Sequence, residues 1–147
     1  MDSFYTPSKI VDITIQNGIK KVKKRHRTQL LLSFLAGMFI AFAAYSGTMA
    51  MHSVQSTGPA RVLGGAIFPV GLMLVIFLGA ELFTGNCLIS LAVWDKKVKV
   101  WDMFKNLGIV FFGNLLGSFF IVCLCYLSGL WNTSSGLLGA YTLNVAL

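Results

Sequence analysis

The sequence predicts an all-α integral membrane protein with several spans, because it is rich in apolar residues, poor in charge and divided into long apolar blocks. The chain has 147 residues, of which 56% are hydrophobic and 12% are charged, whereas a soluble domain carries about 25% charged residues. The blocks are longer than the periodic stripes of a globular core. The net charge of +7 falls in the segments between them.

Residues 1–29 form a polar and basic lead-in to the first block. Thr6 followed by Pro7 is a typical helix start, because Thr is a good N-cap and Pro is tolerated in the first turn. Apolar side chains then share one helical face at Val11, Ile15, Ile19 and Val22. The spacing predicts a short amphipathic helix lying on the membrane surface.

A basic cluster ends this lead-in, since six of the twelve basic residues lie within Lys20–Arg27. Such a cluster beside an apolar run contacts anionic membrane lipid or sets the topology of the first span. Binding to nucleic acid is disfavoured, because no folded basic domain accompanies the cluster.

Three apolar segments are long enough to cross a bilayer of about 30 Å. Residues 30–51 and 107–130 each fit one span. A cleaved signal peptide is disfavoured at 30–51, because the basic region before it is long and further spans follow. Residues 62–94 would form a straight helix of about 50 Å, so we expect this second span to break near residues 80–86.

The distribution of Lys and Arg among the loops predicts how the chain is oriented in the membrane. They are frequent in the lead-in and in the loop at 95–106, and sparse in the loops at 52–61 and 131–136. The positive-inside rule therefore places the N-terminus and the 95–106 loop in the cytoplasm. Residues 137–147 begin a fourth apolar segment that is too short to cross. We expect an incomplete chain or one half of a split protein.

The polar residues of the second span lie mainly at the expected break. A carboxylate at membrane depth costs about 2.5–3.5 kcal/mol, so Glu81 needs a compensating role. Glu81 either caps backbone groups freed by the break, which we favour, or carries a proton or binds a cation. A carboxylate exposed to the pathway would repel an anion.

Thr84, Gly85 and Asn86 are typical of a new helix start, because Thr and Asn are N-caps and Gly permits unusual backbone angles. A half-helix running on to Trp94 would expose its amide groups within the membrane and favour an anion there. Irregular backbone at this depth survives only in a protein interior or along a cavity. The alternative is a kinked helix without a transport role.

The remaining candidates indicate packing rather than chemistry. Gly113 and Gly117 form GxxxG around Asn114, which favours close helix packing with a hydrogen bond across the contact. Three cysteines lie in apolar blocks without metal spacing: Cys87, Cys123 and Cys125. We read them as small hydrophobes, and we expect neither metal nor cofactor. His26 and His52 lie near span ends and receive no catalytic role.

The string GAELFTGN, followed by a short apolar segment and a basic loop, resembles the formate/nitrite transporter family. The GNLLGS stretch at 113–118 is similar to the third span of that family, and the resemblance extends from Lys9 onward. Its hydrosulfide channel branch is the most similar, although no individual residue selects that branch.

The resemblance implies an aquaporin-like fold of six spans in two inverted halves, of which this chain supplies the first. It also implies a homo-pentamer in the cell inner membrane, with a pore in each protomer. The expected substrates are small monovalent anions such as formate, nitrite or hydrosulfide. No enzymatic activity is expected.

The family pattern assigns pore roles to four residues of this sequence. Leu72 and Phe83 would form the cytoplasmic constriction of the pore, and Phe68 would contribute to the outer one. Thr84 would face the central chamber and form a hydrogen bond with the family's central histidine. Glu81, Gly85 and Asn86 would structure the loop.

The second half of the family pattern, with its broken span and central histidine, has no counterpart in this sequence. We expect that half in the same or another chain. A structural or regulatory membrane subunit without transport activity is the main alternative. A membrane redox enzyme that uses the cysteines or His52 ranks lower, because the ligand spacing is poor.

Overall fold

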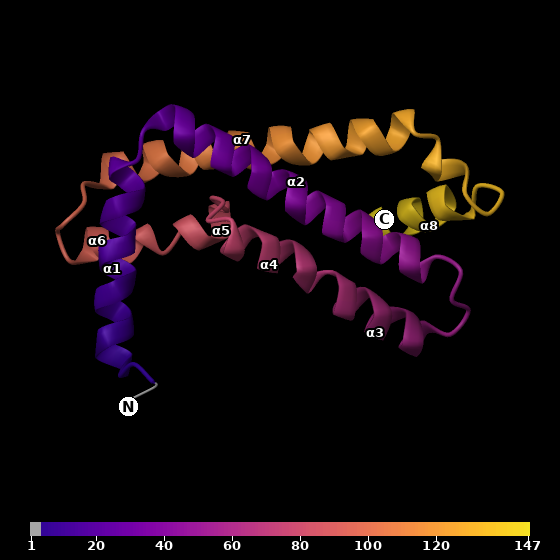
Figure 1. Ribbon diagram of the computed structural model, residues 1–147, viewed down its shortest axis with the longest axis horizontal. Coiled ribbons are helices and arrows are strands. Elements are labelled where there is room, and N and C mark those ends of the chain that lie inside the picture. The colour runs from indigo at the N-terminus through magenta and orange to yellow at the C-terminus, as the bar shows by residue number, and fades with distance from the viewer. Residues whose placement is uncertain (1–3) are drawn as a thin grey trace.

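The computed structural model describes residues 4–147, and every regular element in that range is helical (Figure 1). Residues 1–3, the start of the predicted lead-in, lie outside the described range. In chain order the elements are α1 (Pro7–Lys23), α2 (His26–Met51), α3 (Thr57–Ile67), α4 (Pro69–Phe77), α5 (Phe83–Asn86), α6 (Ile89–Trp94), α7 (Val100–Leu127), the 3₁₀ helix η1 (Leu130–Asn132) and α8 (Leu137–Ala146). The prediction of an all-α protein is confirmed.

Within residues 4–147, three helical stretches are long and apolar enough to cross a membrane: His26–Met51, Thr57–Phe77 and Val100–Leu127. The predicted number of spans is therefore confirmed, although each helix begins four to seven residues earlier than its apolar run. Apolar composition marks the hydrocarbon layer, whereas helical hydrogen bonding continues into the polar interface. Large apolar side chains on these helices are mostly exposed, as expected where lipid is the solvent.

The second span is interrupted, as predicted. Its first part, α3 and α4, bends at Phe68, where Pro69 has no N–H to continue the helical ladder. The chain leaves the helix after Phe77 and resumes at Phe83 with α5 and α6. The predicted loop at 52–61 is shorter than expected, because α3 already begins at Thr57.

Helices α2 and α7 form the closest helix pair, and glycines make the contact possible (Figure 1). A Cβ on Gly37 would overlap the carbonyl oxygen of Asn114, and one on Gly117 would overlap that of Phe34. Gly113 faces the side chain of Ser33 in the same way. The predicted role of GxxxG in close packing is confirmed.

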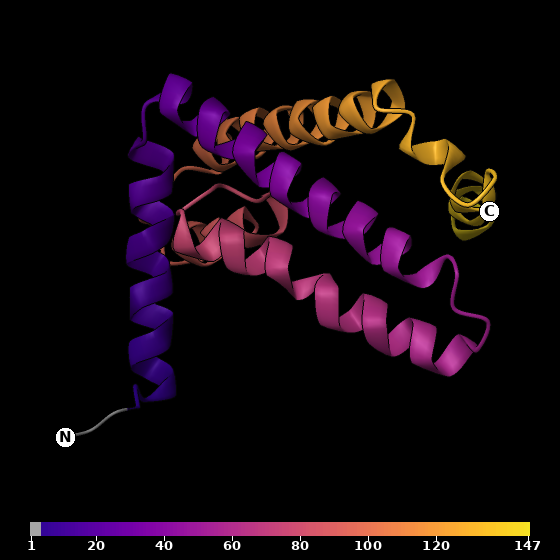
Figure 2. The ribbon, with the colours of Figure 1, turned by 45° about the vertical axis from the view of Figure 1, so that its right-hand side comes forward.

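Helix α1 crosses the ends of the spans at a steep angle (Figure 2). Its predicted start is confirmed, because the Thr6 hydroxyl accepts a hydrogen bond of 3.4 Å from the N–H of Lys9. The helix packs on α6. Of the predicted apolar face only Ile15 is fully buried, while Val11 is exposed. The buried stripe of α1 therefore runs through Ile15 and Gly18.

This contact between α1 and α6 is also close. Ile89 and Ala92 of α6 are buried, with exposed fractions of 1% and 0%. A Cβ on Gly18 would lie 3.2 Å from the Cβ of Ala92. The lead-in helix is thus fixed to the segment that follows the break, in addition to any contact with lipid.

The apolar segment at the end of the chain forms helix α8, and a turn with two left-handed glycines, Gly129 and Gly136, precedes it. Leu138 is completely buried. The ring of Trp131 packs edge-on against Tyr45 with centroids 5.3 Å apart. The Nε2 of His52 lies 3.1 Å from the Ser134 hydroxyl, which joins the two loops at this end.

We predict that Gly117→Ala destabilises the protein by about 1–3 kcal/mol, because its new methyl group would collide with the backbone of α2. Gly108→Ala on the same helix is the matched control, since nothing lies within 4 Å of its added Cβ. Thermal unfolding in detergent should separate the two variants. Equal stability would contradict the glycine-mediated contact.

Candidate functional site

The interruption of the second span begins with a Schellman motif at the end of α4. Gly79 adopts a left-handed φ of 63°, a conformation that glycine accepts without strain. Its N–H donates to the carbonyl of Ile76 at 3.2 Å, and the N–H of Ala80 donates to that of Val75 at 2.9 Å. Ala80 and Val75 also pack together in one apolar cluster, as this motif favours.

The glycine with unusual backbone geometry is therefore Gly79 and not Gly85, as the sequence pattern had indicated. Gly85 lies inside α5, without a positive φ. The new helix also starts slightly earlier than expected, since Leu82 is the N-cap and Thr84 already lies in the first turn. The missed signal is a glycine one residue beyond the C-cap, Leu78, of an apolar helix.

The extended residues after Gly79 find hydrogen-bond partners in both neighbouring spans. The N–H of Glu81 donates to the carbonyl of Leu32 in α2 at 3.2 Å. The side chain of Asn114 in α7 donates to the carbonyl of Glu81 at 2.9 Å and accepts from the N–H of Phe83 at 2.9 Å. The same amide donates to the carbonyl of Ser33 at 2.7 Å.

Asn114 thus replaces backbone hydrogen bonds that the interrupted helix cannot make itself. Irregular backbone at membrane depth requires such internal partners, because lipid offers none. The sequence predicted a hydrogen bond across the helix contact at Asn114 and did not connect it with the break. The residue is part of the site and not only of the packing.

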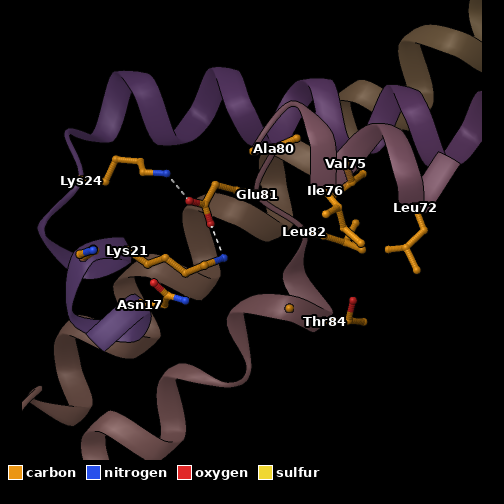
Figure 3. Close-up of a pocket in the computed structure, with 13 residues that line it drawn as sticks. Asn17, Lys21, Lys24, Leu72, Val75, Ile76, Ala80, Glu81, Leu82 and Thr84 are labelled. Carbon is orange, nitrogen blue, oxygen red and sulfur yellow. Dashed lines mark hydrogen bonds and ion pairs between the residues drawn. The ribbon is translucent and has the colours of Figure 1, made fainter. Parts of the chain in front are cut away.

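The carboxylate of Glu81 is 2% exposed and pairs with two lysines of the lead-in (Figure 3). Lys21 Nζ lies 2.9 Å from one oxygen, and Lys24 Nζ lies 2.5 Å from the other. Glu81 therefore does not cap freed backbone groups with its side chain, as we had favoured. It acts as a binding site for two ammonium groups of this chain.

Asn86 extends this polar cluster toward the third span. Its side-chain oxygen accepts from Lys21 at 2.5 Å, and its amide nitrogen donates to the side chain of Asn106 at 2.8 Å. Asn106 in turn donates to the carbonyl of Lys21 at 3.2 Å and accepts at its own carbonyl from Gln29 at 3.2 Å. The network joins α1, α2, α5 and α7 around the break.

An open cavity of about 610 Å³ lies beside this network, between α1, the end of α4 and the start of α5 (Figure 3). One wall is apolar and comes from α4, with Leu72, Val75 and Ile76. The opposite wall carries polar and cationic groups of α1 and of its C-cap residue: Asn17, Lys20, Lys21 and Lys24. Three lysines and one glutamate among the lining residues leave a net charge of +2.

The structure brings some of the predicted site residues together at this cavity and places others outside it. Leu72, Thr84 and Gly85 line the cavity. Phe83 packs against Phe111 with ring centroids 5.9 Å apart, and Phe68 lies at the bend between α3 and α4, half exposed. The side chain of Thr84 is exposed, and its hydroxyl has no hydrogen-bond partner within residues 4–147.

These features define a multi-pass membrane protein whose second span is interrupted at a polar network. The sequence model of a family described as "Formate/nitrite transporter" matches residues 8–147. The chain therefore belongs to the formate/nitrite transporter family, which confirms the family predicted from GAELFTGN. The family comprises channels and transporters, so no enzymatic activity is assigned.

Individual relatives agree with this assignment. The formate channel BtFdhC of Bacillus thuringiensis is 35% identical over 132 residues, which cover 87% of this chain and 51% of the relative. The formate channel FocA of Escherichia coli strain K12 is 32% identical over 142 residues, which cover 95% of this chain and 50% of the relative. The formate-nitrite transporter of Plasmodium falciparum is 31% identical over 125 residues, which cover 78% of this chain and 40% of the relative. The chain spans about half the length of these relatives.

We predict that Asn114→Ala destabilises the protein by about 2 kcal/mol, because two hydrogen bonds to the break and one to Ser33 in α2 are lost, and each is worth about 0.6 kcal/mol in a membrane protein. Asn144→Ala on the exposed face of α8 is the matched control. Unfolding in mixed detergent micelles measures both. Equal unfolding midpoints for the two variants would contradict the role of Asn114.

We predict a coupling of about 1–3 kcal/mol between Glu81 and Lys24 in a double-mutant cycle of Glu81→Gln and Lys24→Met. The value is below that of a fully buried pair, because Lys24 is 30% exposed. The exposed pair Asp95 and Lys97, joined at 2.7 Å, should show much weaker coupling in the cycle of Asp95→Asn and Lys97→Met. Similar coupling in both cycles would refute the structural importance of the Glu81 pair.

Proposed function

We propose that this chain supplies one half of a channel for small monovalent anions, in which the cavity at the break is part of the pathway. The observation that carries the proposal is the cavity lined by Leu72, Thr84 and the lysines of α1. A cationic wall opposite an apolar wall attracts an anion and then removes its water. Family membership supports the same function.

The charge of Glu81 does not oppose this proposal. The carboxylate is buried and paired with Lys21 and Lys24, so an anion in the cavity faces a positive balance of charge. The N–H groups of Thr84 and Gly85 lie in the first turn of α5, where a helix has no acceptor of its own for them.

The dry parts of the pathway are assigned to Phe68, Leu72 and Phe83. Apolar constrictions exclude bare ions, because removing water from a charge is costly. We place Thr84 in a chamber between them, where it would bond a histidine supplied by the second half. Protonation near this point would let a weak acid such as formic acid cross the dry step in neutral form. Formate and nitrite are the first anions to test, with hydrosulfide beside them.

The complete transporter in this proposal has six spans in two inverted halves with an aquaporin-like fold, and it assembles as a homo-pentamer with a pore in each protomer. The chain spans about half the length of its relatives, which supports a second half in the same or another chain. In this proposal the protein lies in the inner membrane with its N-terminus in the cytoplasm, an orientation that the Lys-rich lead-in and the Lys-rich loop at 95–106 support through the positive-inside rule.

The test is anion flux in liposomes that carry the purified protein together with any second half that co-purifies. We expect formate influx above that of empty liposomes, and a reduction of about tenfold in Thr84→Val, because a hydrogen bond to a charged group is worth about 1.5–3 kcal/mol. Thr48→Val is the matched control, since its hydroxyl bonds the carbonyl of Ala44 away from the cavity. The variants have nearly the same volume as the original residues.

Two outcomes would contradict the proposal at different levels. Flux that is unchanged in Thr84→Val at every pH would remove Thr84 from the pathway while leaving the channel function in place. An absence of flux of all three anions, with protein correctly folded in the liposomes, would favour the structural or regulatory subunit.

A further inference from the structure

A second open groove lies on the outer surface of the close pair formed by α2 and α7, at the end where both helices begin. Its volume is about 500 Å³, and it shares no lining residue with the cavity at the break. The lining residues are His26, Arg27, Leu30, Gly108, Ile109 and Phe112. The groove therefore combines two cationic or titratable side chains at one end with apolar walls along its length.

The apolar walls of the groove face outward. Leu30 is 43% exposed and Phe112 is 61% exposed. Gly108 forms the floor between them without a side chain, and nothing lies within 4 Å of a Cβ placed there. The buried polar contacts of Gln29 and Asn106 use other faces of the same two helices, so the groove is not part of the network at the break.

The end of the groove carries positive charge that the protein does not neutralise. The salt bridges in residues 4–147 involve Lys21, Lys24 and Lys97 and leave Arg27 without an acidic partner. Lys105 is exposed and precedes Ile109 by one helical turn, so it lies on the face of α7 that forms the groove. Trp101, one turn earlier, is 76% exposed and has the position of an interfacial anchor.

We propose that this groove binds one anionic phospholipid. Arg27, with His26 and Lys105, contacts the phosphate headgroup, and the upper part of an acyl chain lies over Gly108 between Leu30 and Phe112. Charge complementarity selects this occupant, because a basic end above an apolar groove at the start of two spans matches a lipid with a negative headgroup. Basic pockets between spans are known to favour such lipids.

The test uses photoactivatable phosphatidylglycerol, with the reactive group in the acyl chain near the headgroup, in phosphatidylcholine bilayers that contain the purified protein. Crosslinks are mapped by mass spectrometry to peptides that contain Leu30 or Ile109. We expect several-fold more crosslinking than with photoactivatable phosphatidylcholine. Arg27→Gln should reduce the crosslinking of phosphatidylglycerol about fivefold, which corresponds to about 1 kcal/mol per basic residue at an anionic surface.

Two matched controls separate a defined groove from general surface charge. Arg25→Gln removes the same charge two residues earlier, outside the groove, and should change the crosslinking less than twofold. Gly108→Leu should abolish crosslinking by filling the floor of the groove. Gly65→Leu makes the same change at an open helical position on α3 and should have no effect.

Three results would overturn the proposal. Equal crosslinking of phosphatidylglycerol and phosphatidylcholine would show an ordinary lipid-facing surface. Equal losses in Arg25→Gln and Arg27→Gln would show diffuse attraction by the basic cluster. A complete absence of crosslinks in the groove would show that another protein segment covers it. Because the readout is lipid contact, each result is independent of anion flux.

Discussion

The structure depends on one constraint, which is that backbone groups released by an interrupted helix must find hydrogen-bond partners inside the protein. Residues 80–82 have no regular secondary structure between α4 and α5, and the carbonyl of Glu81 and the N–H of Phe83 are both bound by Asn114. Among residues 4–147 the buried polar and charged side chains are Gln29, Ser33, Glu81, Asn86 and Asn106. All of them lie in or next to this network, so nearly all internal polarity of the protein serves the break.

The same constraint explains why α2 and α7 approach so closely. Asn114 reaches the carbonyl of Ser33 in α2 as well as the break, and it can do so only because glycines bring the two backbones together at Gly113 and Gly117. Packing and polarity are therefore not separate features here. A larger residue in the glycine stripe would move the amide of Asn114 away from the groups that it satisfies.

Local patterns were sufficient to predict the helical class, the three spans, the interruption and the helix start at Thr6, because each depends on composition or on neighbours within one turn. Contacts between distant parts of the chain could not be predicted in the same way. Glu81 pairs with Lys24, which lies 57 residues away, and nothing in the sequence near either residue indicates the other. The unusual backbone angles that we expected at Gly85 occur at Gly79 instead, because α5 begins before Gly85 and the turn that ends α4 lies at Gly79. The roles of Phe68, Leu72, Phe83 and Thr84 in a pore stay predictions.

The hydrogen bonds of Asn114 have a consequence for biogenesis. The chain emerges from the ribosome in order, so the lysines of α1 are already present when Glu81 enters the bilayer, whereas Asn114 arrives only with the next span. In that interval the carboxylate has its counter-charges, but the carbonyl of Glu81 does not yet have its donor, and the N–H of Phe83 does not yet have its acceptor. The backbone of the interrupted second span therefore gains these hydrogen bonds only when the third span lies beside it.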